Sequence, residues 1–349
     1  MQQNSNIMLN HYNYNFAARF VSDYKLPISV LSEKEFEYEV NLYERDFSTL
    51  TKWNWAVENI LKEYWGLDDF LDAYSIVRDK IINGVLESEG YKQFNNSKEI
   101  ADAIKSIPNL KPQNGAKSVY NYDNVGHHFI SFDMKKANFQ TMRIAGIIAQ
   151  ETYGDFIGQF CDGIMKEYVT ESKYTRQVVF GKLNPSRTIN YEKYLMSKAY
   201  VDVIQPMTES LGVTLMYVGS DEIILRADNY SGSGDYIPDE IKNEIISKTS
   251  LDIRIEEYDL CGYEFSVRKP DNTMHKIGEF YKRTCDPVGK FKSIPLQFHK
   301  LIYKKMCNME IEDKDRIFNY DKCCRAMLLD EFIITEVPSA KNHQKCLIH

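Results

Sequence analysis

Apolar residues recur with helical spacing through most of residues 35–90. One such face, with side chains at i, i+3, i+4 and i+7, is formed by Trp53, Ala56, Val57, Ile60, Leu61 and Tyr64. The pattern continues from Leu67 to Leu86, beyond a glycine at position 66. Residues 139–170 and 188–211 show the same periodicity. These three parts of the chain are therefore predicted to be helical.

Strands are predicted where apolar and polar residues alternate. His128 to Asp133 alternates in this way and ends in an aspartate. Val213 to Leu225 contains two β-rich runs separated by Gly219-Ser220-Asp221-Glu222. This arrangement predicts a hairpin with acidic residues at its tip. Residues 253–267 alternate again and are expected to be strands.

Turn-forming residues mark the connections between these segments. Residues 107–126 and the YSGSGD run at 230–235 are rich in Pro, Gly, Asn or Ser, as loops are. The last 45 residues are helical in pattern and then polar. The order of helices, strand, helices, hairpin, strands and helices predicts an α+β fold with an antiparallel sheet and packed helices.

The composition is that of a globular protein, with 43% hydrophobic and 27% charged residues in 349. It excludes disordered, collagenous and disulfide-scaffold classes. No run of eighteen apolar residues occurs, so no membrane partner is expected. The first residues lack a secretory signal pattern. Seven cysteines without a CxxC pair suggest reduced thiols, and hence a cytoplasmic location.

Charge is segregated along the chain. The total of 43 basic and 50 acidic residues gives −7, which alone disfavours a nucleic-acid partner. Residues 266–306, however, carry ten Lys or Arg against three acids, whereas the first 130 residues carry 13 basic and 18 acidic residues. The basic stretch fits either a solvated face or a phosphate-binding surface. The acidic N-terminal region is a candidate surface for a protein partner.

Two acidic positions follow apolar β sequence: Asp133 at a strand end, and Asp221 with Glu222 at the hairpin tip. Carboxylates that converge from a strand end and a hairpin form a site for hard cations such as Mg²⁺ or Mn²⁺. Two such ions about 4 Å apart would activate a 3′-hydroxyl and stabilise a leaving pyrophosphate. The alternative is that these acids are ordinary turn residues. His127 and His128, which precede the strand, are expected to be structural.

Three segments, in chain order, carry a family resemblance. Phe132–Gln140 (FDMKKANFQ) resembles the first palm motif of reverse transcriptases, in which a strand-end Asp is followed by a small residue, a gate residue and Phe. Phe180–Pro185 (FGKLNP) resembles the segment that opens their template-facing helix. Tyr217–Leu225 (YVGSDEIIL) resembles the catalytic hairpin of reverse transcriptases and RNA-dependent RNA polymerases.

The resemblance implies a palm-type polymerase that adds nucleotides to a primer 3′ end. Asp133, Asp221 and Glu222 would hold two Mg²⁺ or Mn²⁺ ions. Residues 126–265 would form the palm catalytic domain, and residues 1–125 a mostly helical, fingers-like region. Residues 266–330 would form a basic, thumb-like region, and residues 331–349 a tail.

The same resemblance assigns substrate contacts. The residues expected to bind nucleotide, template or pyrophosphate are Asn138, Phe139, Arg176, Phe180, Gly181 and Lys276, with Lys269, Lys282 and Arg283 as further contacts in the thumb-like region. Asn138 stands where DNA-making reverse transcriptases place a bulky aromatic residue that excludes the ribose 2′-hydroxyl. An amide can donate to and accept from that hydroxyl. The resemblance therefore favours NTPs as substrates and RNA as the nucleic-acid partner.

The hairpin departs from the family, because Asp221-Glu222 stands where Asp-Asp is usual. With Ser220, it resembles the Ser-Asp-Glu hairpin of tRNA-His guanylyltransferase-like enzymes, and in part the hairpin of diguanylate cyclases. Family A DNA polymerases also have a strand-end Asp and a later Asp-Glu. These families share two-metal palm chemistry. The alternative of another class is a non-catalytic nucleic-acid-binding protein on a degenerate palm.

Overall fold

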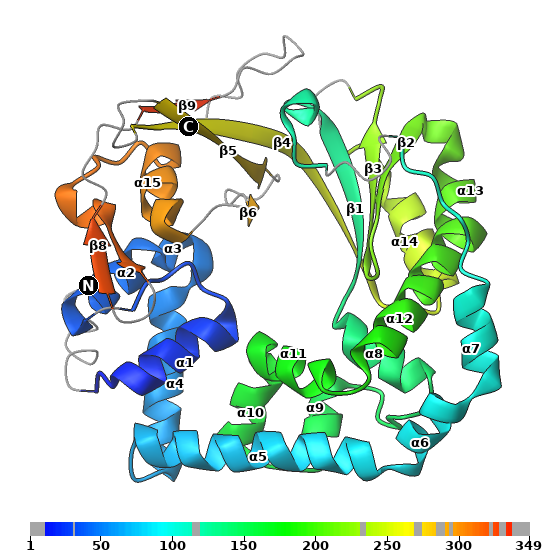
Figure 1. Ribbon diagram of the computed structural model, residues 1–349, viewed down its shortest axis with the longest axis horizontal. Helices are drawn as coiled ribbons and strands as arrows, with labels where there is room; N and C mark the ends of the chain where they lie inside the picture. The colour runs from blue at the N-terminus through cyan, green and yellow to red at the C-terminus, as the bar shows by residue number, and fades with distance from the viewer. Residues whose placement is uncertain are drawn as a thin grey trace. The chain divides into compact units, whose positions relative to one another are not determined.

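The computed structural model describes residues 11–30, 32–113, 119–230, 235–268, 274–283, 290–292, 296–320, 324–327 and 333–336 (Figure 1). The chain divides into two compact units. The helical unit comprises residues 1–97, 142–188 and 295–328, and the sheet unit comprises residues 98–141, 189–294 and 329–349. Within the described residues, no helix is both long and apolar enough to cross a membrane.

The helical unit contains most of the helices and a small two-stranded sheet. Its elements are α1 (Tyr14–Tyr24), α2 (Glu33–Leu42), α3 (Glu44–Phe47), α4 (Thr49–Glu63), α5 (Leu67–Glu87), α6 (Glu89–Asn96), α9 (Tyr153–Ile157), α10 (Gly163–Glu171), α11 (Lys173–Gly181), α15 (Leu296–Met306), the 3₁₀ turn η4 (Asp313–Arg316), β7 (Ile317–Tyr320) and β8 (Cys324–Met327).

Aromatic side chains form the core of the helical unit. Phe16 on α1 lies 5.3 Å from Trp53 on α4 and 6.1 Å from Tyr168 on α10, measured between ring centroids. Phe70 on α5 packs against the same tyrosine at 5.1 Å. These rings are almost completely buried. The apolar face read from the helical spacing of α4 is therefore the face that packs into this core.

Buried ion pairs attach α15 to the rest of the helical unit. Lys300 Nζ lies 2.8 Å from Glu39 Oε1, and Lys304 Nζ lies 2.7 Å from Asp315 Oδ2. All four side chains are buried. Lys300 and Lys304 belong to the basic stretch expected to form a thumb-like region. Their charges are neutralised inside the helical unit, so these two lysines are not available to phosphate groups.

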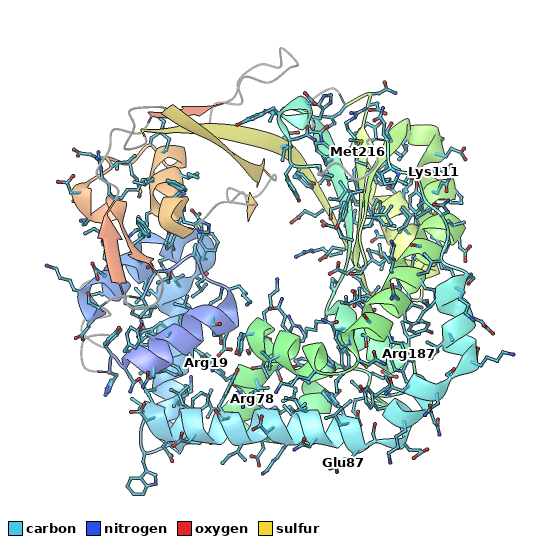
Figure 2. All side chains as sticks on the ribbon, viewed as in Figure 1. Arg19, Arg78, Glu87, Lys111, Arg187 and Met216 are labelled. Carbon is cyan, nitrogen blue, oxygen red and sulfur yellow. The ribbon has the colours of Figure 1, made fainter. Side chains whose placement is uncertain are left out.

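Figure 2 labels Arg187, which holds the end of α6 in the helical unit. Its guanidinium donates hydrogen bonds to the main-chain oxygens of Phe94 at 2.9 Å and Ser97 at 2.7 Å. These carbonyls lie at and just beyond the end of the helix, where no intrahelical donor is available. Arg187 therefore caps the C-terminal end of α6 through its side chain.

The sheet unit is built around one long antiparallel sheet. Its elements are α7 (Lys98–Lys105), η1 (Tyr122–Asn124), β1 (His128–Met134), the π-helical turn η2 (Tyr200–Ile204), α13 (Gln205–Thr208), η3 (Glu209–Leu211), β2 (Val213–Val218), β3 (Glu222–Ala227), α14 (Asp239–Lys248), β4 (Ile253–Arg268), β5 (Met274–Arg283), β6 (Lys290–Lys292) and β9 (Ile333–Glu336). Helix α8 (Ala137–Ile144) begins in this unit, and α12 (Pro185–Ala199) ends in it.

The strands lie in the order β2-β3-β1-β4-β5-β6, and β9 also pairs with β4. All of these pairs are antiparallel. From β1 to β4 the chain runs strand, helices, strand, strand, helix, strand. This is the β-α-β-β-α-β connectivity, with the first strand in the middle of the sheet. The predicted α+β class and antiparallel sheet are confirmed.

One face of the central strands is completely buried. Ile130 and Phe132 on β1 and their register partners Leu225 and Ile223 on β3 have no exposed surface. Helices α12, α13 and α14 lie beside these strands in Figure 1, and Met196 of α12 is buried as well. This face therefore holds the main apolar core of the sheet unit.

The opposite face has its own, smaller core at one end. Buried apolar side chains gather there: Val119, Val125, Phe129, Met216, Ile224, Tyr258 and Leu260. Met216, labelled in Figure 2, comes from β2 at a register shift in its pairing with β3. At the other end of this face, toward the C-terminal end of β1, the side chains are Ser131 and then Asp133. This face of the sheet therefore has an apolar end and a polar end.

His128 at the start of β1 is the centre of a buried charged cluster. Its Nδ1 lies 2.9 Å from Asp259 Oδ1, and its Nε2 lies 3.0 Å from Glu257 Oε2. The ring of Tyr230 stacks on the imidazole, with the two ring centroids 3.8 Å apart. Glu257 also accepts a hydrogen bond from the backbone N–H of Tyr236 at 2.6 Å. The structural role expected for His128 is confirmed, because it fastens the segment after β3 to the sheet.

One expectation differs from the structure. The last 45 residues, whose pattern was expected to be helical, contain the short strands β7, β8 and β9 instead. These segments form strands because of their pairing partners: β9 pairs with the long strand β4, and β7 pairs with β8. The two units are interleaved along the chain, since each is built from three separate segments.

Candidate functional site

The ends of three neighbouring strands bring the predicted acids together. Asp133, next to last in β1, is the register partner of Glu222, the first residue of β3. On its other side, Asp133 is the register partner of Arg254, the second residue of β4. Directly opposed residues in an antiparallel pair have Cβ atoms about 4.5–5.5 Å apart and project from the same face. The two carboxylates and the guanidinium therefore share one end of one sheet face.

Asp133 is tied to the arginine. Arg254 Nη2 donates to Asp133 Oδ2 over 2.6 Å. The carboxylate is 27% exposed and the guanidinium side chain is 49% exposed. Burial raises the pKa of Asp133, the Arg254 charge opposes that rise, and the charges of Glu222 and Asp221 add to it. The negative charge of this site is therefore only partly balanced by the arginine.

The hairpin tip is held against β1 by the main chain. The N–H of Met134 donates to the carbonyl of Asp221 at 2.8 Å, and the N–H of Gly219 donates to the carbonyl of Glu222 at the same distance. The hydroxyl of Ser220 lies 3.4 Å from Asp221 Oδ1. These bonds position Asp221 beside the end of β1. The predicted hairpin with acids at its tip is confirmed.

The ring of Tyr217 approaches the glycine of this tip closely. A Cβ atom on Gly219 would lie 2.9 Å from Cε1 and 3.0 Å from the hydroxyl of Tyr217. The tyrosine ring therefore covers the glycine and stays partly exposed beside the acids. Burial raises the pKa of Tyr217, and the charges of Glu222 and Asp221 raise it further. This tyrosine lies close enough to the acids to sense their charge.

Glu222 has a partner on the neighbouring strand. Ser131 Oγ donates to Glu222 Oε1 over 2.5 Å, and Ser131 itself is buried. A serine two residues before Asp133 on the same strand face is in the correct position for this contact. The hydrogen bond orients one oxygen of the glutamate within the sheet face.

A further carboxyl group, Glu192 on α12, was missed by the sequence reasoning. It is 4% exposed, and its Oε2 has no hydrogen-bond partner within the described residues. Burial raises its pKa to about 7, a hydrogen bond with Ser220 opposes the rise, and the charge of Asp221 adds to it. Glu192 precedes Met196 by four residues, so an acid on the apolar face of a helix was the signal that could have found it.

The turn that follows Asp133 is clamped to the start of β4. Gln140 is buried, and its side chain accepts from the N–H of Asp252 at 2.8 Å and donates to the carbonyl of Asp252 at 2.9 Å. The N–H of Lys135 also donates to that carbonyl at 2.9 Å. Asn138, half-buried, lies in the first turn of α8 within this clamped segment. The main chain around Asn138 is thus fixed relative to Asp133.

The other predicted residues are placed as follows. Phe139 is buried. Arg176, Phe180 and Gly181 lie on α11 in the helical unit, where Phe180 packs against Phe156 with its centroid 6.5 Å away. The Arg176 guanidinium lies 5.5 Å from the ring centroid of Tyr153 in the same unit, and burial lowers its pKa.

The residues expected in the basic region lie partly outside the described residues. The backbone of Lys276 belongs to β5, opposite Ser266 of β4, and its side chain lies outside the description. Lys282 and Arg283 lie on the same strand, and Lys269 lies outside the described residues.

No three His, Cys, Asp or Glu side chains form a ready-made metal-binding group within the described part of the chain. The acids at the strand ends are nevertheless oxygen donors, the ligand type that Mg²⁺ and Mn²⁺ prefer. No protein-family model, curated protein or solved structure matches the chain.

Proposed function

We propose that this protein is a palm-type nucleotidyltransferase that adds nucleotides to the 3′ end of a nucleic acid. The observation that carries the proposal is the direct pairing of Asp133 with Glu222, with Asp221 held next to them by the Met134 hydrogen bond. These three acids occupy one end of a partly exposed face on a β-α-β-β-α-β sheet. Strand-end and hairpin carboxylates on such a sheet are the arrangement that two-metal catalysis needs.

The residues have separable roles in this proposal. Asp133, Asp221 and Glu222 would hold the divalent cations, and the buried Glu192 lies close enough to the hairpin to interact with Ser220 and Asp221. When bound, Mg²⁺ or Mn²⁺ supplies activation of the 3′-hydroxyl and charge stabilisation for the departing pyrophosphate. The Gln140 clamp holds the turn between Asp133 and Asn138. Asn138 would contact the ribose 2′-hydroxyl, which supports NTPs as substrates and RNA as the nucleic acid.

Primer extension tests the proposal. The full-length protein is incubated with Mg²⁺ or Mn²⁺, an RNA or DNA primer, with and without template, and NTPs or dNTPs. Incorporation is expected with NTPs and is expected to be abolished in Asp133→Asn and Asp221→Asn. Asp202→Asn is the matched control, because that acid is half-exposed and paired with Lys198 on a helix. Full activity in either site variant contradicts the metal assignment, and a clear preference for dNTPs contradicts the role of Asn138.

The Ser220-Asp221-Glu222 tip supports a second candidate within the same chemistry. A guanylyltransferase-like enzyme would add a nucleotide to an RNA end without copying a template. The same assay separates the two, because such an enzyme would incorporate GTP alone whatever the template sequence. Incorporation that follows the template base would exclude this candidate. Absence of both nucleotide incorporation and Mn²⁺ binding would favour a non-catalytic nucleic-acid-binding protein.

A further inference from the structure

Arg254 is a cation placed among the acids of the proposed site. It lies on β4 directly opposite Asp133, and Glu256, two residues further along, lies opposite Ser131 on the same face. The Asp133, Glu222 and Glu256 carboxylates therefore share this end of the face with the Arg254 guanidinium, and Asp221 lies at its edge. The nearby Lys135 pairs with a different carboxylate, since its Nζ lies 2.9 Å from Asp252 Oδ1.

Within the described part of the chain, the contact with Asp133 engages only part of the Arg254 guanidinium. A guanidinium carries five N–H donors in a planar fork. A single nitrogen, Nη2, makes the contact with Asp133. Half of the side chain is exposed, and ion pairs with that exposure contribute little to stability. The pair can therefore open readily, and about half of the arginine side chain is accessible to a ligand, since it is 49% exposed.

A divalent cation and Arg254 compete for the same carboxylate. Asp133 Oδ2 accepts from the guanidinium, so an ion bound to this oxygen would compete with the arginine for it. The released guanidinium would stay close to the cation, because Arg254 is the register partner of Asp133 on the neighbouring strand. The negative group that accompanies such a cation in the proposed reaction is the triphosphate of a nucleotide. Arginine is well suited to phosphate because its fork binds two oxygens at once.

We propose that Arg254 is the triphosphate-binding residue of this site, held by Asp133 when the site is empty and transferred to the phosphates when a metal–nucleotide complex enters. This inference rests on the proposed function. It assigns Asp133 two successive partners, Arg254 and then a divalent cation. It also makes Arg254 a residue that opposes binding of the metal alone and favours binding of the nucleotide.

Two binding measurements test the exchange. Mn²⁺ binding is followed by electron paramagnetic resonance, and binding of a non-hydrolysable GTP analogue with Mg²⁺ is followed by calorimetry, both on the full chain. In Arg254→Gln, Mn²⁺ affinity is expected to rise several-fold because the competitor is gone. Nucleotide affinity is expected to fall about 10- to 100-fold, the size expected for losing charge-assisted hydrogen bonds. Arg254→Lys, which keeps the charge without the fork, is expected to lie between.

Arg226→Gln is the matched control. Arg226 is an arginine opposite Phe129 on the same sheet, and its Nε lies 2.8 Å from Asp228 Oδ1, away from the acids. Its substitution is expected to leave both affinities unchanged. Equal loss of Mn²⁺ and nucleotide affinity in Arg254→Gln, or no change in nucleotide affinity, would overturn the inference while primer extension still tests the proposed function. A wild-type protein that binds neither Mn²⁺ nor nucleotide would overturn both.

Discussion

The charged cluster around His128 predicts a stability that depends on pH. Both ring nitrogens face carboxylates, Asp259 at 2.9 Å and Glu257 at 3.0 Å. A carboxylate accepts hydrogen bonds and does not donate them, so the ring satisfies both carboxylates only when both nitrogens carry protons and the imidazole is a cation. Burial opposes this charge, but the hydrogen bonds to Asp259 and Glu257 outweigh it and raise the pKa of His128.

The groups around the imidazole determine how the charge is balanced. Glu257 is almost completely buried and also contacts Lys242 Nζ at 3.0 Å, while Asp259 is 29% exposed. Burial by itself would raise the pKa of Glu257. Its hydrogen bonds with His128 and Lys242 and with backbone N–H groups outweigh burial and lower this pKa to about 2. Tyr230 and Tyr236 cover the ring from the segment after β3. Glu257 therefore stays ionised throughout the range in which His128 titrates.

His128→Gln removes the charge and one of the two hydrogen bonds. Breaking a buried ion pair costs about 3–5 kcal/mol, and the partial exposure of Asp259 places the expected loss near the lower end, about 3 kcal/mol at pH 6. Because the folded pKa is raised, the part of this stabilisation that depends on the imidazole charge is complete below the unfolded pKa of about 6.5 and is lost as pH rises through the folded pKa. When a single proton is involved, the unfolding free energy cannot change by more than about 1.4 kcal/mol per pH unit.

Urea denaturation of the wild type and His128→Gln between pH 6 and pH 9 measures this effect. The difference in unfolding free energy is expected to be largest at pH 6 and to shrink as pH rises above 7. His11→Gln is the control, since His11 is exposed. A difference between wild type and His128→Gln that stays constant over this range would refute the assignment of a buried imidazolium.

Three further predictions concern individual contacts. Gly219→Ala is expected to lower stability by about 1 kcal/mol, because the Cβ of the new alanine would lie 2.9 Å from the ring of Tyr217. In a double-mutant cycle, this loss should disappear in a Tyr217→Ala background. Glu192→Gln is expected to stabilise the metal-free protein by about 2–3 kcal/mol at pH 8 and to have little effect at pH 5. The reason is that a folded pKa of about 7 makes ionisation of Glu192 in the folded protein unfavourable as pH rises from about 4.5. Equal effects at both pH values would contradict this. Lys300→Met is expected to cost about 3–5 kcal/mol in chemical denaturation by leaving Glu39 buried without its partner, and a Glu39→Gln/Lys300→Met double variant should recover most of the loss.

Local patterns predicted most of the elements. The helical spacing of Trp53, Ala56 and Ile60 predicts a packed helix face, and those residues are buried in α4. The alternation before Asp133 predicts β1, and the Gly-Ser-Asp-Glu run predicts the β2–β3 hairpin. These features depend on spacing within about ten residues, so the sequence is sufficient to reveal them. The short strands after α15 were missed because their partners, not their own pattern, determine them.

The sequence by itself determined the identity of the acids, their positions at a strand end and a hairpin tip, and the apolar faces that bury the neighbouring residues. Only the tertiary structure decided their partners. Arg254 lies 121 positions from Asp133 in the chain, and Glu192 approaches the hairpin from a separate helix. Strand register and helix packing create these contacts, and both depend on burying apolar surface contributed by the whole sheet unit. No local pattern contains that information, so the charge balance of the site is a property of the fold.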